Sequence, residues 1–280
     1  MVFIPKGEFH IGPINIHLEK CDNRAMSTTV PADRMRSVLV MVATIAMIAY
    51  NGLATAGYVN GVTPAAISDK YPTVLTPAGY AFSIWTLIYI GLIAFSVYQL
   101  LSVNLVRFRP VRSLYVVSCV LNCAWIYFWH HDQIAICLII ILALLATLII
   151  ILVRFSQEEG AAGALFTKIP FGIYAGWVTA ASLVNFVVFL NYLGISFGAG
   201  TWSAIGAAMI MLAAAVAIVV RWRLKNYIFP MSIAWAGTAI AVKQSGNTAI
   251  VVAAAICVII CLILTLSFVM DQKTFDYENR

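Results

Sequence analysis

Residues 134–153, IAICLIIILALLATLIIILV, contain no charged side chain. A run of about 20 mostly apolar residues makes an α-helix long enough to cross the hydrocarbon core of a bilayer. This run is apolar on every side, so it has no polar face to turn toward water. We therefore expect residues 133–153 to form a membrane-spanning helix with much of its surface against lipid.

The composition of the whole chain agrees with this expectation. Of its 280 residues, 62% are hydrophobic and 10% are charged, whereas soluble domains carry about 25% charged residues. The mean hydropathy is +0.95. The chain is therefore predicted to be an integral membrane protein whose first partner is the lipid bilayer. Its net charge of +6 is interpreted as a signal of membrane orientation, and no nucleic-acid partner is expected.

Seven further stretches are apolar and about long enough to span a bilayer. The predicted fold class is all-α, a polytopic membrane bundle of about eight transmembrane helices. The predicted spans are residues 37–59, 79–103, 113–130, 133–153, 170–192, 201–220, 227–243 and 247–270.

The basic residues predict how these spans are oriented. If the N-terminus is cytoplasmic, the inside segments hold 15 of the 17 Lys and Arg residues, and the outside loops hold only Lys70 and Lys243. A positive-inside bias of this size predicts that both termini are cytoplasmic, in a plasma, inner or organelle membrane. Residues 1–36 would form a loosely packed N-terminal tail and residues 271–280 a C-terminal tail.

Charged residues are missing from the apolar body of every predicted span. Intramembrane charges mark proton relays and ion paths, so their absence argues against a proton-coupled pump. No catalytic constellation stands out, and an enzyme is less expected than a binding protein. The His-His-Asp run at 130–132 is interpreted as a polar turn, and the intramembrane cysteines as apolar packing, rather than as metal ligands.

Polar and aromatic residues recur at helical spacing in four of the spans. An asparagine at membrane depth must find a hydrogen-bond partner, because lipid offers none. The asparagines should therefore face protein or a cavity, and the aromatics share their faces. The spacing leaves two interpretations level, a pocket wall for a flat ligand or ordinary packing. The candidate residues are Asn51; Phe82, Trp85 and Tyr89; Asn122 and Trp125; and Tyr174, Trp177 and Asn185.

Three segments carry a family resemblance. They are TPAGYAFSIWTLIY at 76–89, LNCAWIYFW at 121–129 and IPFGIYAGWVTAASLVNF at 169–186. Their order and spacing resemble the second-, third- and fifth-helix blocks of the TspO/MBR family, the tryptophan-rich sensory and translocator proteins. The first segment follows the pattern P-x(4)-F-x-x-W-x-x-[LI]-Y.

The resemblance implies a five-helix membrane core over residues 37–192, followed by three additional transmembrane helices over 193–270. It also implies a pocket for tetrapyrroles such as protoporphyrin IX, for sterols and for synthetic ligands. The sequence departs from the short family form in two ways. Its segment KYPTVLTP at 70–77 lacks the tryptophan that the family carries there, and the three extra spans suggest a distinct branch whose ligand need not be a porphyrin.

The leading hypothesis is a binding or regulatory protein for a flat hydrophobic ligand, such as a tetrapyrrole or another pigment, lined by the candidate residues. Two other classes stay open. The first is an uncoupled transporter, which a structural repeat would favour; residues 168–182 and 228–242 are similar, each with a proline followed by a tryptophan. The second is a structural or assembly subunit. A homodimer and a larger membrane complex are both compatible with the sequence.

Overall fold

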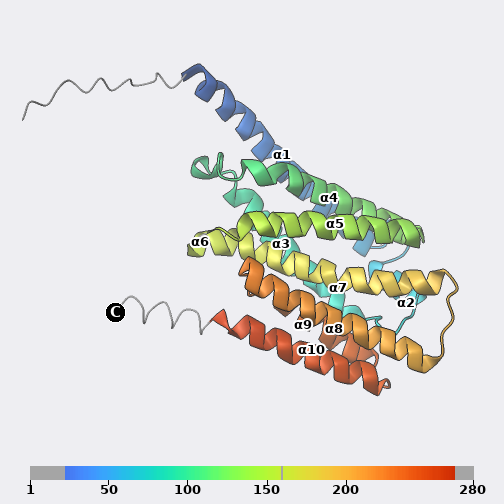
Figure 1. Cartoon of the computed structure of the whole chain (residues 1–280). Coiled ribbons are helices and arrows are strands. Elements are labelled where there is room, and N and C mark those ends of the chain that lie inside the picture. Colours follow the sequence, from blue (N-terminus) through green and yellow to red (C-terminus); the bar gives the residue numbers. More distant parts are fainter. Residues whose placement is uncertain (1–22, 159, 269–280) are drawn as a thin grey trace, which may run out of the picture.

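The computed structural model describes residues 23–158 and 160–268, and within them it is an all-helical bundle without a strand. Figure 1 shows the long helices running along a common direction, with α1 and α4 on one side, α8 to α10 on the other and α7 between them. The helices are α1 (Asn23–Thr55), α2 (Pro64–Lys70), α3 (Ile84–Tyr98), α4 (Arg109–His130), α5 (Ile134–Phe155), α6 (Ala161–Gly163), α7 (Ile169–Tyr192), α8 (Ala199–Leu224), α9 (Phe229–Lys243) and α10 (Thr248–Leu266).

Seven helical segments of the described chain are long and apolar enough to cross a membrane. They correspond to seven of the eight predicted spans. The remaining prediction, residues 227–243, forms α9, which has 15 residues and a length of about 22 Å. That length is shorter than the hydrocarbon core of about 30 Å. The polytopic helical bundle is thus confirmed, and α9 is a shorter helix that packs against α7, α8 and α10.

The ends of several predicted spans lie elsewhere in the structure. α1 begins at Asn23, so part of the predicted N-terminal tail is helical, whereas residues 1–22 and the predicted tail 271–280 lie outside the described residues. The second span opens with the 3₁₀ turn η1 (Gly79–Ser83). Helix α7 is preceded by α6 and the π-helical turn η3 (Ala164–Lys168). A further 3₁₀ turn, η2 (Ser102–Asn104), separates α3 from α4.

A polar cluster explains why the third span begins earlier than residue 113. Arg112 in the first turn of α4 is buried. Its Nε donates to Oε1 of Gln99 at 2.9 Å, and the same oxygen accepts from the Ser37 hydroxyl at 2.8 Å. Asp33 of α1 pairs with Arg109. Because these groups satisfy one another, α1, the end of α3 and the start of α4 are joined at one end of the bundle.

The opposite end of the bundle carries residues 56–78, which join α1 to η1. We call this segment the linker, and the end of the bundle on which it lies the linker end.

α7 is the central helix and packs against α3, α5 and α9. Two glycines allow a close approach to α9. A Cβ atom added at Gly172 would lie 2.4 Å from Oδ1 of Asn226, and one at Gly176 would lie 2.5 Å from the carbonyl oxygen of Phe229. Glycines four residues apart are a common device for bringing membrane helices into backbone contact. The first turn of α9 therefore lies against α7, and both helices run toward the linker end.

Candidate functional site

An aromatic-lined cavity lies between α3, α4, α7 and α9 and beneath the linker. We call it the aromatic cavity. Its free volume is about 40 Å³. The lining residues are Ser68, Pro77, Phe82, Trp85, Trp125, Trp129, Trp177, Ala180, Ala181, Val184, Asn185, Ala236 and Ile240.

The aromatic rings of the cavity contact one another in two groups. Trp177 of α7 lies edge-to-face with Trp85 at 6.4 Å between ring centroids and with Phe82 at 6.1 Å. Across the cavity, Trp125 and Trp129 of α4 stack at 5.5 Å. Such separations are those of favourable aromatic pairs. The rings are therefore packed against each other, and the cavity between the two groups is closed down to a small volume.

One amide faces this cavity. The Nε1 of Trp125 donates to Oδ1 of Asn185 at 3.3 Å, and Nδ2 of Asn185 donates to the carbonyl oxygen of Ala181 at 2.9 Å. Asn185 therefore links α4 to α7, and its oxygen keeps one lone pair for a further donor. A ligand with a single hydrogen-bond donor could be oriented here.

Five of the nine candidate residues line the aromatic cavity: Phe82, Trp85, Trp125, Trp177 and Asn185. The other four lie beside it.

Three of those four form a hydrogen-bonded chain across the bundle. Nδ2 of Asn51 in α1 donates to Oδ1 of Asn122 in α4 at 2.7 Å. Nδ2 of Asn122 in turn donates to the Tyr174 hydroxyl of α7 at 3.0 Å. The fourth, Tyr89, stacks on Trp85 at 5.6 Å. The two asparagines therefore face protein, as their depth requires, and their amides are engaged with each other and with Tyr174.

Sequence reasoning missed several residues of the cavity. Trp129 fits the role of an interfacial anchor by its place near a helix end, but the structure shows it 3% exposed, with its Nε1 donating to the carbonyl oxygen of Pro64 at 3.3 Å. Its spacing of four residues from Trp125 was the signal for an inward position. Ala236 and Ile240 come from α9, and no periodicity in the first five spans could have pointed to them.

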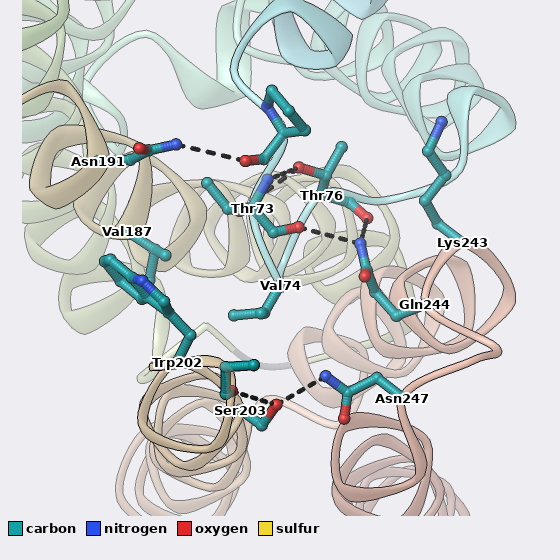
Figure 2. A pocket seen from close by; sticks show the side chains of 12 residues that line it. Thr73, Val74, Thr76, Val187, Asn191, Trp202, Ser203, Lys243, Gln244 and Asn247 are labelled. Carbon is teal, nitrogen blue, oxygen red and sulfur yellow. Dashed lines mark hydrogen bonds between the residues drawn. The ribbon is translucent and has the colours of Figure 1, made fainter. Parts of the chain in front are cut away.

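A second and larger hollow opens at the linker end, and we call it the linker pocket (Figure 2). Its volume is about 510 Å³. Its walls come from the linker, the end of α7, the start of α8, the end of α9 and the turn before α10. The lining residues are Pro72, Thr73, Val74, Thr76, Val187, Asn191, Ala199, Trp202, Ser203, Lys243, Gln244 and Asn247.

The linker between the two hollows is held by side chains from the later helices. Nε2 of Gln244 donates to the carbonyl oxygens of Thr73 at 3.0 Å and Thr76 at 3.1 Å, and Nδ2 of Asn191 donates to that of Pro72 at 3.3 Å (Figure 2). The backbone N–H of Ala78 donates to the carbonyl oxygen of Ala239 at 3.0 Å. The segment 72–78 is thus fixed to α7 and α9 by its own backbone.

The other side of the linker is tied to α4. Asp132, after α4, accepts from Lys70 and, at 2.8 Å, from the Tyr71 hydroxyl. The hydrogen bond from Lys70 lowers the pKa of Asp132 below its ordinary value. Burial, with the neighbouring Asp132 carboxylate, raises the pKa of Tyr71 to about 12. The tyrosine hydroxyl therefore keeps its proton and remains a donor at neutral pH.

No group of three His, Cys, Asp or Glu side chains suited to a metal ion occurs within the described residues.

The comparisons with known proteins extend the resemblance seen in the sequence. The family model described as TSPO-like protein matches residues 37–268. It therefore includes α8, α9 and α10 as well as the first five spans. No curated protein and no solved structure matches the chain. The seven apolar spans and the family match along most of the chain together show that this multi-pass integral membrane protein belongs to the TSPO-like family.

Proposed function

We propose that this protein binds a flat, largely apolar ligand in the aromatic cavity and acts as a membrane binding or regulatory protein. A tetrapyrrole is the first candidate. The observation that carries the proposal is the convergence of Phe82, Trp85, Trp125, Trp129 and Trp177, from η1 and the helices α3, α4 and α7, on one cavity. Tryptophan and phenylalanine faces suit a flat ligand, because stacking gains contact area without requiring a polar group.

Binding requires the cavity to open. Sites for drug-sized ligands occupy about 300–1,000 Å³, and the aromatic cavity has about 40 Å³. The space must come from rotation of the lining rings or displacement of the linker at Pro77. The ligand would then bind a minor, opened state, and its apparent affinity would be reduced by the population of that state.

A titration with protoporphyrin IX in nanodiscs tests this proposal. The double substitution Trp85→Ala with Trp177→Ala should raise the Kd at least tenfold. Ala181→Leu fills the cavity without removing an aromatic ring and should also raise the Kd. The control is Trp222→Ala, because Trp222 lies exposed on α8, and its Kd should stay within twofold of the unsubstituted protein.

Thermal unfolding of each variant separates lost binding from lost folding. If all four proteins bind protoporphyrin IX equally, the aromatic cavity is not its site. If the unsubstituted protein shows no saturable binding, a tetrapyrrole is not its ligand.

A further inference from the structure

The linker pocket is separate from the aromatic cavity, because the two share no lining residue. Its volume of about 510 Å³ lies within the range of small-molecule sites, about 300–1,000 Å³. Three of its five walls come from α8, α9 and the turn before α10. The pocket therefore depends on the three helices that follow the first five spans, because they supply most of its walls.

The walls of the pocket differ in chemistry. Figure 2 shows Trp202 and Val187 on one side and Lys243 on the opposite side, with Val74 of the linker between them. Among the described residues that line the pocket, Lys243 is the one with a charged side chain, and the other polar side chains are amides and hydroxyls. A site with a cation at one end and an indole at the other matches a ligand that is anionic at one end and flat and apolar at the other.

The amides around the pocket are already engaged with protein. Besides the linker contacts of Gln244 and Asn191, Nδ2 of Asn247 donates to the Ser203 hydroxyl at 2.8 Å, and Ser203 donates to the carbonyl oxygen of Ala199 at 2.9 Å. These bonds join the start of α8 to the turn before α10. The walls of the pocket are thus fixed without a ligand, so binding would not have to order them.

Lys243 is accessible to a competing anion. Its Nζ lies 2.9 Å from Oδ1 of Asp69, and the two side chains are 43% and 53% exposed. Exposed ion pairs of this kind are weak, because water screens them and both side chains lose freedom. The carboxylate of Asp69 does not line the pocket. Because this pair is weak, the Lys243 side chain can turn from Asp69 toward a ligand anion inside the pocket.

We propose that the linker pocket binds a small amphipathic anion, with its carboxylate, sulfonate or phosphate beside Lys243 and its flat apolar part against Trp202 and Val187. The anion can be a soluble molecule or the headgroup of an anionic lipid, since both present the same chemistry. The proposal does not depend on ligand binding in the aromatic cavity.

Calorimetric titration in phosphatidylcholine nanodiscs tests it with two probes of one shape, naphthalene-1-sulfonate and its neutral analogue naphthalene-1-sulfonamide. The unsubstituted protein should bind the sulfonate at least tenfold more tightly. Lys243→Gln should remove that difference, because it replaces the cation by a neutral polar side chain that is one bond shorter. Trp202→Ala should weaken both probes at least tenfold.

Each variant has a matched control. The control for Lys243→Gln is Lys70→Gln, which removes the lysine of another exposed ion pair at the linker end, that of Lys70 with Asp132. The control for Trp202→Ala is Trp222→Ala, which removes the tryptophan at the far end of the same helix, α8. Both controls should stay within twofold of the unsubstituted protein. Equal affinity for the two probes, absence of saturable binding, or equal effects of Lys70→Gln and Lys243→Gln would overturn the proposal.

A second lipid composition identifies the source of the anion. Nanodiscs with phosphatidylglycerol offer an anionic headgroup, and competition is measured with the neutral sulfonamide because a charged surface repels the sulfonate itself. Weaker sulfonamide binding in these discs assigns the pocket to a lipid headgroup. Unchanged binding assigns it to a soluble anion.

Discussion

α7 and α9 lie side by side, and each has proline as its second residue, Pro170 and Pro230, with a tryptophan in the following two turns. The tryptophans occupy opposite environments. Trp177 is 4% exposed and lines the aromatic cavity, whereas Trp235 is 37% exposed. Trp235 instead donates to the carbonyl oxygen of Ala81 at 3.0 Å.

The difference in exposure between Trp177 and Trp235 follows from a difference of two residues in their spacing from the helix proline. Trp177 stands seven positions after its proline and Trp235 five positions after its own. Two positions rotate a side chain by about 200° around a helix axis, so the same pattern directs one indole inward and the other outward. α9 presents Ala236 and Ile240 to the cavity in place of a ring. The similarity between 168–182 and 228–242 therefore does not place the two tryptophans on equivalent walls.

The largest expected effect on stability is the difference between replacing Trp177 and replacing Trp235. Trp177→Ala should lower the free energy of unfolding by about 3–5 kcal/mol, because it removes a fully packed aromatic side chain from the interior. Trp235→Ala should lower it by less than half as much, since lipid or detergent can occupy the vacated space. Equilibrium unfolding in mixed micelles measures both. Equal losses would mean that the two tryptophans have equivalent packing.

The next effect tests the contact between the two helices. Gly176→Ala should destabilise by about 1–3 kcal/mol, because a close-packed site has no room for an added methyl group and the carbonyl oxygen of Phe229 lies 2.5 Å from the new Cβ.

Gly237→Ala is the matched substitution on α9. Its Cβ would meet Val258 Cγ2 at 3.4 Å, an ordinary contact, so it should be neutral or stabilising by up to about 1 kcal/mol through helix propensity. The same unfolding assay applies, and a reversed order of the two glycines would contradict the close approach of α7 and α9.

Asn226, just before α9, should have an intermediate effect. Its Oδ1 accepts from the backbone N–H of Phe229 at 2.9 Å, and its Nδ2 donates to the carbonyl oxygen of Lys168 at 2.8 Å. The side chain thus accepts from the first backbone N–H of α9 and ties this helix to the residue that precedes α7. Asn226→Ala should lower the free energy of unfolding by about 1–2 kcal/mol. Asn226→Asp keeps the acceptor and loses the donor, so its loss of unfolding free energy should lie between those of the unsubstituted protein and Asn226→Ala. If aspartate costs as much as alanine, the whole effect comes from the hydrogen bond to the carbonyl oxygen of Lys168.

The smallest effect lies outside the α7–α9 contact, at Asp132. Its pKa is lowered in the folded protein, so its contribution to stability is present above its ordinary value of 3.8 and is lost as the pH falls through the lowered folded value. The pair with Lys70 is exposed, and its contribution should not exceed about 1 kcal/mol.

Asp132→Asn should therefore reduce the fall in the free energy of unfolding as the pH is lowered. The difference in stability between Gly176→Ala and Gly237→Ala should stay the same in this background, because Asp132 lies outside the α7–α9 contact. Asp132 has a positive φ of 57°, which asparagine also tolerates, so the substitution does not strain the turn. A steeper fall in the variant would contradict the assignment.

The helical membrane bundle was predictable because long apolar runs have few alternatives in a bilayer. Spacing also placed Phe82, Trp85, Trp125, Trp177 and Asn185 on faces that meet. It could not distinguish these from Asn51 and Asn122, because an inward asparagine can pair with another asparagine as well as with a ligand. Deciding between the two needs the distance between helices, which a single sequence does not carry.

The linker pocket was beyond sequence reasoning for a related reason. Its residues come from five short segments at helix ends, none of which has a period. Lys243 was visible as one of the two basic residues that the predicted orientation places outside, but its partner Asp69 lies 174 positions away in the chain. The antiparallel return of α9 after α8 brings the turn that holds Asn247 back to Ser203 at the start of α8.

The attachment of the linker to Gln244 has a consequence for biosynthesis. The hydrogen bond from Gln244 to Thr73 spans 171 positions of the chain. At a synthesis rate of about 5–20 residues per second, the ribosome needs about 10–30 s to make that stretch. During this interval the segment 72–78 has been synthesised, but Gln244, whose side chain binds the carbonyl groups of Thr73 and Thr76 in the folded protein, has not. Insertion of the last helices is therefore the step that completes the first loop of the protein.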